Sequence, residues 1–115
     1  MKAMLITYNG LCEVIDTNGK YEEIREILQG FIEHVSIIKD GKVVGSMYVN
    51  EEGKLMGLPV NNVATTLYLR GRYGYDVIVG DALVFGEGDS DGNETSISPE
   101  LTADIIRLCE HQTTE

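Results

Sequence analysis

The chain is organised around Asn50-Glu51-Glu52-Gly53-Lys54-Leu55-Met56-Gly57-Leu58-Pro59-Val60-Asn61, a polar turn followed by a Gly-Leu-Pro break. A second segment, residues 67–75, follows it and is rich in Arg, Tyr and Gly. Both segments lie between strongly apolar runs, and loops held by a rigid scaffold are where proteins commonly carry their sites. We therefore expect the flanking runs to build the fold and the connector to carry any site.

On the N-terminal side, four short runs are rich in residues that favour β-strands. These runs are residues 1–8, 11–16, 31–38 and 42–49. The first two flank Asn9-Gly10 and the last two flank Asp40-Gly41, and both dipeptides tolerate the positive φ angles of a tight hairpin turn. The sequence therefore predicts two hairpins, and we expect the strands of the second to be central in the sheet.

Helical spacing of apolar residues marks three further segments. Residues 21–28 form an amphipathic pattern that should end at Gly30 in a left-handed cap, and residues 60–68 favour one or two helical turns. The third segment begins at Ser98-Pro99-Glu100, which combines a hydroxyl cap with a proline at the first helical position. Between the last two, residues 77–85 are the longest apolar run and predict a buried strand with a bulge at Gly80.

This order of elements predicts an α+β domain with a mostly antiparallel sheet of about five strands, two packed helices and a short helical connector. A chain of 115 residues fits one domain, residues 1–115. We expect a flexible acidic loop at residues 87–95 and a frayed tail at residues 111–115. The loop superficially resembles a calcium-binding loop, but its glycine and glutamate spacing is wrong for one, so no metal site is predicted.

The chain carries 19 acidic and 9 basic side chains, which give a formal net charge of −10. Such a charge repels nucleic-acid backbones and acidic membrane surfaces, so non-specific binding to either is not expected. An acidic surface can attract a basic protein or imitate the phosphates of DNA, but it also serves simply to keep a protein soluble.

The two cysteines, Cys12 and Cys109, lie near opposite ends of the chain and have no metal-binding spacing. We expect both to be small core residues of a reduced, cytoplasmic protein. No apolar run approaches the roughly 20 residues that a membrane helix needs.

No pattern of catalytic residues is recognisable. Nucleophile elbows, cysteine-histidine signatures and phosphate-binding glycine loops are all missing, and the acidic pairs Glu22-Glu23 and Glu51-Glu52 point in diverging directions on a helix or strand. The sequence therefore disfavours an enzyme, and it predicts no catalytic residue and no cofactor.

The connector is the exception to the acidic background. Arg70 and Arg72 lie within three residues of each other beside Tyr73 and Tyr75. Guanidinium groups fork onto phosphates and tyrosine rings stack on bases, so this composition suits a small nucleotide better than a long polyanion. Nearby side chains that can add hydrogen bonds are those of Lys54, Asn61 and Asn62. The alternative is purely structural, with the arginines pairing with carboxylates and the tyrosines edging the core.

The motif of residues 50–61, with Tyr75-Asp76-Val77-Ile78-Val79-Gly80-Asp81 downstream, resembles a family of small proteins from phages, plasmids and conjugative elements that is catalogued as a domain of unknown function. In that family an arginine commonly follows the motif asparagine, whereas Asn62 stands there in this chain. The resemblance implies where such a protein is encoded, but it does not imply a particular reaction or ligand. Small proteins of such elements often inhibit host defence.

Two functional hypotheses follow. The first is a non-enzymatic protein of a phage or mobile element that sequesters a small, for example cyclic, nucleotide signal through the ligand-binding residues named above. The second is an acidic interaction module or DNA mimic that presents residues 87–94 and the helix acids Glu22, Glu23 and Glu26 to a basic host protein. Both are compatible with a homo-oligomer.

Overall fold

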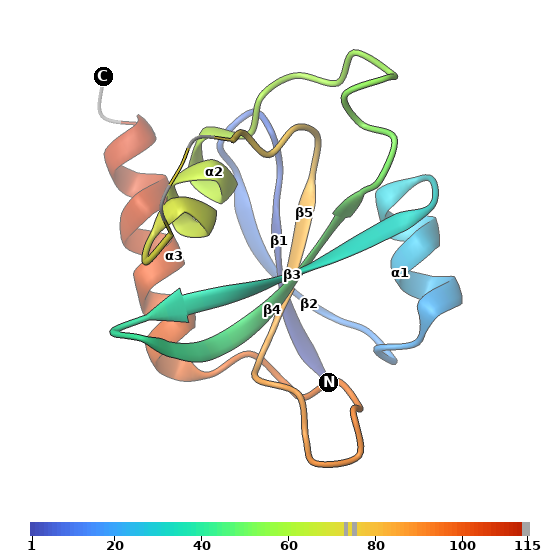
Figure 1. Cartoon of the computed structure of the whole chain (residues 1–115), viewed down its shortest axis with the longest axis vertical. Coiled ribbons are helices and arrows are strands. Elements are labelled where there is room, and N and C mark those ends of the chain that lie inside the picture. Colours follow the sequence, from blue (N-terminus) through green and yellow to red (C-terminus); the bar gives the residue numbers. More distant parts are fainter. Residues whose placement is uncertain (73, 75, 114–115) are drawn as a thin grey trace.

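A computed structural model describes residues 1–72, 74 and 76–113, and it shows a five-stranded antiparallel sheet with the strand order β2-β1-β5-β4-β3. Helix α1 lies on one side of the sheet, and α2 and α3 lie on the other (Figure 1). The elements are β1 (Lys2–Ile6), β2 (Cys12–Asp16), α1 (Tyr21–Leu28), β3 (Ile32–Lys39), β4 (Lys42–Asn50), α2 (Asn62–Leu69), β5 (Ala82–Phe85) and α3 (Pro99–Thr113). The predicted α+β class is confirmed, with α2 as the short helical connector.

Both predicted hairpins form. The second has the expected two-residue turn, since Asp40 and Gly41 have φ 53° and 77°, whereas the first has a longer connection, residues 7–11, in which only Gly10 has a positive φ, of 90°. The expectation that β3 and β4 are both central is wrong for β3. β5 pairs with β4 and with β1, so β4 is internal, whereas β3 has no strand on its outer side among the described residues.

The strand predicted at residues 77–85 is shorter than expected. Gly80 has φ 74°, which ends the extended conformation, so Gly80 lies in a turn and not in a bulge of a continuous strand. Before it, Val79 forms only an isolated bridge with Val60. After it, β5 is buried along its whole length, as expected for a strand between β1 and β4.

The helix ends follow local rules, with one correction. The backbone N–H of Leu101 donates to Oγ of Ser98 at 3.1 Å, which confirms the predicted cap of α3. α1 ends one residue earlier than expected, because Gln29, with φ 60°, and not Gly30, takes the left-handed position after the helix. Helix α3 continues through residue 113 and so includes the first part of the predicted tail.

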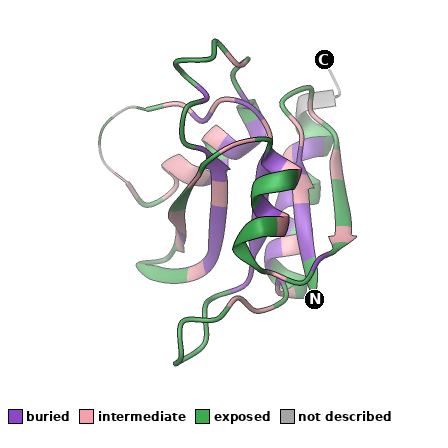
Figure 2. Ribbon diagram, turned by 90° about the vertical axis from the view of Figure 1, so that its right-hand side faces the viewer, coloured by how far each residue is buried: buried purple, intermediate pink, exposed green. Residues whose placement is uncertain are grey.

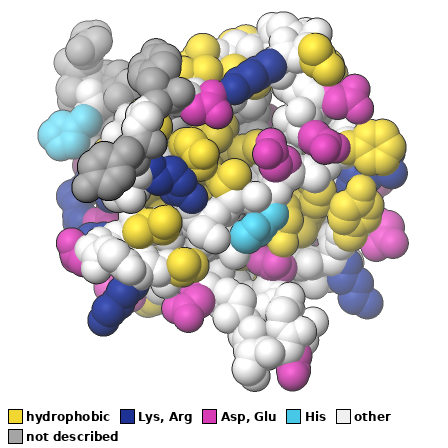
Figure 3. Space-filling model, viewed as in Figure 1, with side chains coloured by type: hydrophobic (Ala, Val, Ile, Leu, Met, Phe, Trp, Pro, Cys, Tyr) yellow, Lys and Arg dark blue, Asp and Glu magenta, His cyan; other side chains and the backbone are white. Residues whose placement is uncertain are grey.

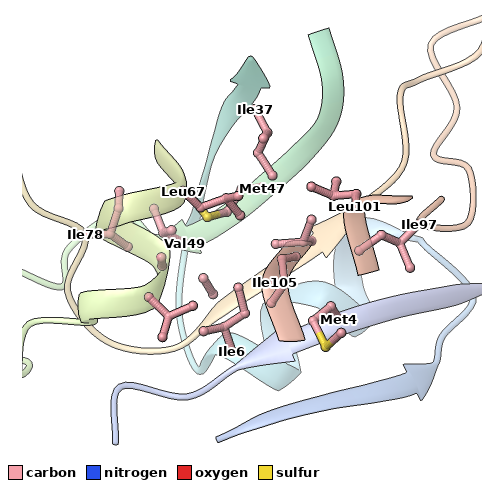
Figure 4. Packing of buried hydrophobic residues seen from close by; sticks show 14 of the residues in the cluster. Met4, Ile6, Ile37, Met47, Val49, Leu67, Ile78, Ile97, Leu101 and Ile105 are labelled. Carbon is pink, nitrogen blue, oxygen red and sulfur yellow. The ribbon is translucent and has the colours of Figure 1, made fainter. Parts of the chain in front are cut away.

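The sheet separates two apolar cores. The larger one lies between the sheet and helices α2 and α3, and its packing is shown in Figure 4. The smaller one lies under α1, where Ile24 and Leu28 pack against Leu83 and Phe85. Figure 2 shows the buried residues concentrated on the central strands and on the inner sides of the helices. Burial on both faces explains why the central strands read as continuous apolar runs.

The cysteines correct another expectation. Cys12 of β2 and Cys109 of α3 form a disulfide with a Cα–Cα distance of 6.6 Å. Both residues do pack against the larger core, as expected, but they are not free thiols. The error arose because their separation of 97 residues gives no local sign that the chain brings them together.

Candidate functional site

The two asparagines that bound the central motif have structural roles. Asn50 is buried at the end of β4, where its Nδ2 donates to the carbonyl oxygens of Leu28 and Gln29 at 3.2 and 3.4 Å. Its Oδ1 accepts a hydrogen bond from the N–H of Glu52 at 2.9 Å. Asn50 therefore joins the end of α1 to the beginning of the motif loop.

Asn61, which we expected to bind a ligand, is completely buried. Its Nδ2 donates to the carbonyl oxygens of Ile6 and Gly80 at 3.0 and 2.9 Å, and its Oδ1 accepts from the N–H of Ala64 at 3.0 Å and so caps α2. Both amide hydrogens and the oxygen are used inside the protein. The neighbouring Asn62 is exposed at the first position of α2.

Lys54 lies on the motif loop and forms an exposed ion pair with Asp76 at 2.5 Å. The hydrogen bond to Asp76 raises the pKa of Lys54 and lowers that of Asp76. The pair lines a cavity of about 110 Å³, together with Glu33, Val49, Tyr68 and their neighbours. A cavity of roughly 150 Å³ holds a molecule of the size of benzene, so this one is too small for a nucleotide.

The side chain of Arg72 forms hydrogen bonds with neighbouring backbone carbonyl groups. Its guanidinium donates to the carbonyl oxygens of Tyr68 at 2.8 Å and Ser36 at 2.5 Å, and it lies 4.3 Å from the centre of the Tyr68 ring. These contacts tie the connector after α2 to the outer strand β3. The planar fork of arginine suits this double role, which a lysine cannot reproduce.

Arg70 points towards a different neighbour. It follows the last residue of α2, and its Nη1 lies 3.8 Å from Oδ2 of Asp104 on α3. The structure therefore does not bring Arg70 and Arg72 together on one ligand-sized surface. Tyr73 and Tyr75, the aromatic part of the predicted site, lie outside the described residues.

Asp104 is the centre of a cluster that the sequence did not reveal. Its side chain is only 7% exposed, and three cations surround it: Lys39 at 2.9 Å, Arg70 at 3.8 Å, and Arg107, which donates to Oδ1. The hydrogen bond from Lys39 is the main reason that the pKa of Asp104 lies below its usual value, and the charges of Lys39, Arg107 and Arg70 act in the same direction. Asp104 is therefore ionised at neutral pH.

We call Lys39, Arg70, Asp104 and Arg107 the Asp104 cluster. Three positive charges and one negative charge give it a formal net charge of +2, in a chain whose total is −10. The three cationic side chains are 37–63% exposed, whereas the carboxylate beneath them is almost fully covered. The arrangement therefore presents positive charge to solvent and keeps its counterion inside.

The cluster lines an open hollow of about 570 Å³ between α3, the residues after α2 and the β3–β4 hairpin. Its lining residues are Ile38, Lys39, Asp40, Gly41, Arg70, Gly71, Asp104 and Arg107. With Asp40 included, the lining keeps a formal charge of +1. Figure 3 shows basic and acidic side chains next to one another along its left edge, which is where α3 and the β3–β4 hairpin lie in Figure 1.

Three of the four cluster residues were missed by the sequence reasoning. Asp104 and Arg107 have the i, i+3 spacing of a helical ion pair, which is a weak signal because such pairs are common. Lys39 lies 65 residues from Asp104, and only the folded chain places the hairpin beside α3.

The acidic segments lie elsewhere. The turn before α1 approaches the loop of residues 87–94, since a side chain at Gly19 would contact Glu94. The Tyr48 hydroxyl donates to Oε2 of Glu94 at 2.6 Å, and Oδ1 of Asp89 accepts from the N–H groups of Asp91 and Asn93. Burial, with the adjacent Glu94, raises the pKa of Tyr48 well above its usual value. Two of the loop acids, Asp89 and Glu94, thus have internal partners.

The residues that the structure describes contain no helix that is both long and apolar enough to cross a membrane. They also contain no group of three or more His, Cys, Asp or Glu side chains placed to hold a metal ion.

A family model described as "Domain of unknown function (DUF3846)" matches residues 1–110. No curated protein and no solved structure matches the chain.

Proposed function

Because the chain belongs to the DUF3846 family, whose description gives no activity, we propose a function from the geometry of the Asp104 cluster: the protein binds a small phosphorylated nucleotide without transforming it. The observation that carries the proposal is the convergence of Lys39, Arg70 and Arg107 on a single buried carboxylate. One carboxylate balances one cation, so the cluster keeps a formal charge of +2, and the lining of the hollow, which includes Asp40, keeps +1. A phosphate group carries the complementary charge and accepts several hydrogen bonds from such donors.

The size of the hollow supports a nucleotide as the phosphorylated ligand. Its volume of about 570 Å³ lies within the roughly 300–1,000 Å³ that is common for small-molecule sites. The net charge of −10 disfavours a long nucleic acid, whose further phosphates would meet repulsion beyond the cluster. A local positive cluster in a strongly acidic chain therefore favours a small anion over a polymeric one.

The buried Asp104 explains how the cations stay close together without a ligand. Lys39 and the two arginines would repel one another if no carboxylate lay between them. Held in this way, they lose less side-chain entropy when an anion arrives, which improves affinity. We therefore place the proposed site at the Asp104 cluster and not at the motif loop. Of the residues that the sequence suggested, Arg70 belongs to the proposed site, whereas we assign structural roles to Lys54, Asn61 and Arg72.

The biological setting is part of the proposal. We infer from the motif resemblance that the protein comes from a phage or mobile element and that it sequesters a nucleotide signal of host defence, for example a cyclic nucleotide. The sequence shows no recognisable pattern of catalytic residues, and this fits capture better than turnover.

Isothermal calorimetry tests the proposal against a panel of cyclic nucleotides, ADP-ribose derivatives and inorganic phosphate. We expect at least one nucleotide to bind, with an affinity that falls as salt is added. Arg70→Gln and Arg107→Gln should each weaken binding about tenfold, the effect of losing one charge-assisted hydrogen bond. Lys20→Gln, which removes an exposed positive charge at the start of α1, is the matched control and should bind as the wild type does.

Two results would contradict the proposal. If the whole panel gives no heat of binding, the nucleotide hypothesis has no support. If Lys54→Gln loses affinity while Arg107→Gln does not, the site lies in the motif loop and not at the Asp104 cluster.

A second candidate, the acidic interaction module, is favoured by one observation. The turn before α1 lies beside Glu94, so the helix acids and the acidic loop belong to neighbouring surfaces. A basic host protein is the partner that such a surface fits. Replacing Glu22 and Glu26 by Gln should weaken a salt-sensitive complex with that partner, whereas Arg107→Gln should not affect it.

A further inference from the structure

Asp40 is the second acid of the hollow, and it differs from Asp104 in having no cation beside it. Both residues line the hollow. Asp104 has three ion-pair partners, whereas none of the ion pairs in the described part of the chain involves Asp40. Asp40 is also exposed, in the turn between β3 and β4. Its carboxylate is therefore available to a ligand in the hollow.

The backbone of the turn does not explain why an aspartate stands at this position. Asp40 has a φ of 53°, a left-handed conformation that asparagine and glycine also adopt in such turns. Its charge also lowers the formal charge of the hollow from +2 to +1, which weakens the attraction for a phosphate. A carboxylate here therefore fits a ligand that carries hydrogen-bond donors in addition to its phosphate.

An apolar surface lies close to Asp40 in the same hollow. It is formed by Ile38, which is half-buried and lines the hollow together with Gly71. A Cβ atom at Gly71 would lie 3.1 Å from Cγ2 of Ile38, so the glycine leaves this methyl group uncovered. The flat face of a base can therefore pack on Ile38, two residues before Asp40.

We propose that the hollow selects guanine nucleotides and that Asp40 is the specificity-determining residue, an inference that rests on the proposed function. An ionised carboxylate accepts hydrogen bonds through two oxygens and donates none. On the base-pairing edge of guanine, N1–H and the N2 amino group are adjacent donors, and the two carboxylate oxygens can accept from both. Adenine and cytosine have an acceptor nitrogen beside their amino group, and uracil has one N–H between two carbonyl groups. Each of these bases would turn an acceptor towards Asp40.

The two ends of the nucleotide then contact different elements of the fold. The phosphate lies against Arg70, which follows α2, and Arg107 of α3. The base lies on Ile38 and donates to Asp40 at the hairpin. The cations thus supply affinity for any phosphorylated ligand, whereas Asp40 distinguishes one base from another.

The ribose offers another pair of adjacent donors, its 2′- and 3′-hydroxyl groups. A hydroxyl group can donate to a neutral carbonyl oxygen as well as to a carboxylate. Recognition of ribose therefore does not require an acid at a position where asparagine suits the turn. For this reason we assign Asp40 to the base, and a 2′-deoxy ligand separates the two assignments.

Calorimetry at one salt concentration tests the preference with the 5′-monophosphates and the 3′,5′-cyclic monophosphates of guanosine, adenosine, cytidine and uridine. In at least one of the two series, the guanine nucleotide should bind at least about tenfold more tightly than the other three, which is the effect of one bidentate pair. The inosine nucleotide of that series lacks the N2 amino group and should bind more weakly than the guanine nucleotide. The 2′-deoxyguanosine monophosphate should bind as guanosine monophosphate (GMP) does, and a large loss would instead assign Asp40 to the ribose.

The variant Asp40→Asn changes donors and acceptors but keeps the shape of the side chain. An asparagine presents one oxygen and one amino group, which match N1–H and the O2 atom that xanthine has in place of the N2 amino group of guanine. The affinity for xanthosine monophosphate relative to that for GMP should therefore rise at least about tenfold. A ratio measured within one protein reduces the general effect of the lost charge.

Asp91→Asn, the same replacement in the exposed acidic loop, is the matched control and should keep the guanine preference. Asparagine tolerates the φ angle of Asp40, so Asp40→Asn should fold as the wild type does. Circular dichroism checks this, and the comparison of bases on the wild type needs no variant.

The outcomes separate this inference from the proposed function. If nucleotides bind but the wild type does not prefer guanine, the selection is overturned and nucleotide binding remains. If the wild type prefers guanine and Asp40→Asn keeps the same preference, the role of Asp40 is overturned. If no nucleotide binds, the proposed function is lost, and the guanine selection is lost with it.

Discussion

Nζ of Lys39 lies 2.9 Å from Oδ2 of Asp104, although 65 residues separate the two in the chain. Lys39 ends β3 beside the hairpin turn, and Asp104 lies in the second turn of α3. This ion pair connects the hairpin to the helix, and the carboxylate is the one buried acid of the cluster. Asp104 therefore contributes both to stability and to the site at which we propose that a ligand binds.

Replacing Asp104 by Asn should lower the free energy of unfolding by about 1–2 kcal/mol, because three cations lose their shared counterion. Loss of a fully buried pair costs more, but Lys39, Arg70 and Arg107 are partly exposed and water screens them. Urea denaturation followed by circular dichroism measures the change. Asp16→Asn, which removes an exposed ion pair with Lys2, is the control and should leave the urea midpoint unchanged.

The stabilisation by Asp104 should also depend on pH in a defined direction. Its pKa in the folded protein is lower than the unfolded reference of 3.8, so the contribution is complete above that reference and is lost as the pH falls through the folded value. The difference in unfolding free energy between wild type and Asp104→Asn should be constant above about pH 5 and shrink below about pH 4. A difference that grows on acidification would contradict this assignment.

Asn61→Ala should destabilise the protein by about 2–4 kcal/mol, because the cap of α2 is lost and the carbonyl groups of Ile6 and Gly80 are left without their buried donor. The adjacent Asn62 is exposed, so Asn62→Ala should change stability by less than about 0.5 kcal/mol. Chemical denaturation of the two variants side by side is the measurement. Similar effects in both would show that the hydrogen bonds of Asn61 do not hold the motif in place.

Reduction of the disulfide should lower the free energy of unfolding by about 2–4 kcal/mol, with roughly 5 kcal/mol as the limit from chain entropy for so long a loop. The bridge closes a segment of 97 residues, and such a link acts mainly by restricting the unfolded chain. Thermal unfolding with and without dithiothreitol measures the change. The variant Cys12→Ser/Cys109→Ser should show a low melting temperature that does not respond to dithiothreitol.

The sequence predicts the parts of the fold that depend on neighbouring residues. Asp40-Gly41 specifies the turn of its hairpin, Gly10 supplies the positive φ in the longer connection of the other, and Ser98-Pro99 specifies the start of α3, because each acts through backbone angles or a local hydrogen bond. The outer position of β3 was missed because strand order is decided by which strand pairs with β5, and β5 lies far along the chain.

The candidate site was predicted less well for a related reason. A cluster of arginines and asparagines shows which groups are available, but it does not show which of them the fold uses internally. Asn61 and Arg72 bind backbone carbonyl groups, so their chemistry supports the scaffold. Asp104 and Lys39 come together only through tertiary structure, and the pairing of Cys12 with Cys109 has the same cause.

The central position of β5 has a consequence for biosynthesis. In the described part of the chain, β5 is the strand that joins the β1–β2 hairpin to the β3–β4 hairpin. While the ribosome is still adding residues before Ala82, the nascent polypeptide holds two separate ribbons, each with an open edge and an uncovered apolar face. Folding of the sheet during translation is therefore delayed until this strand leaves the exit tunnel and inserts between them.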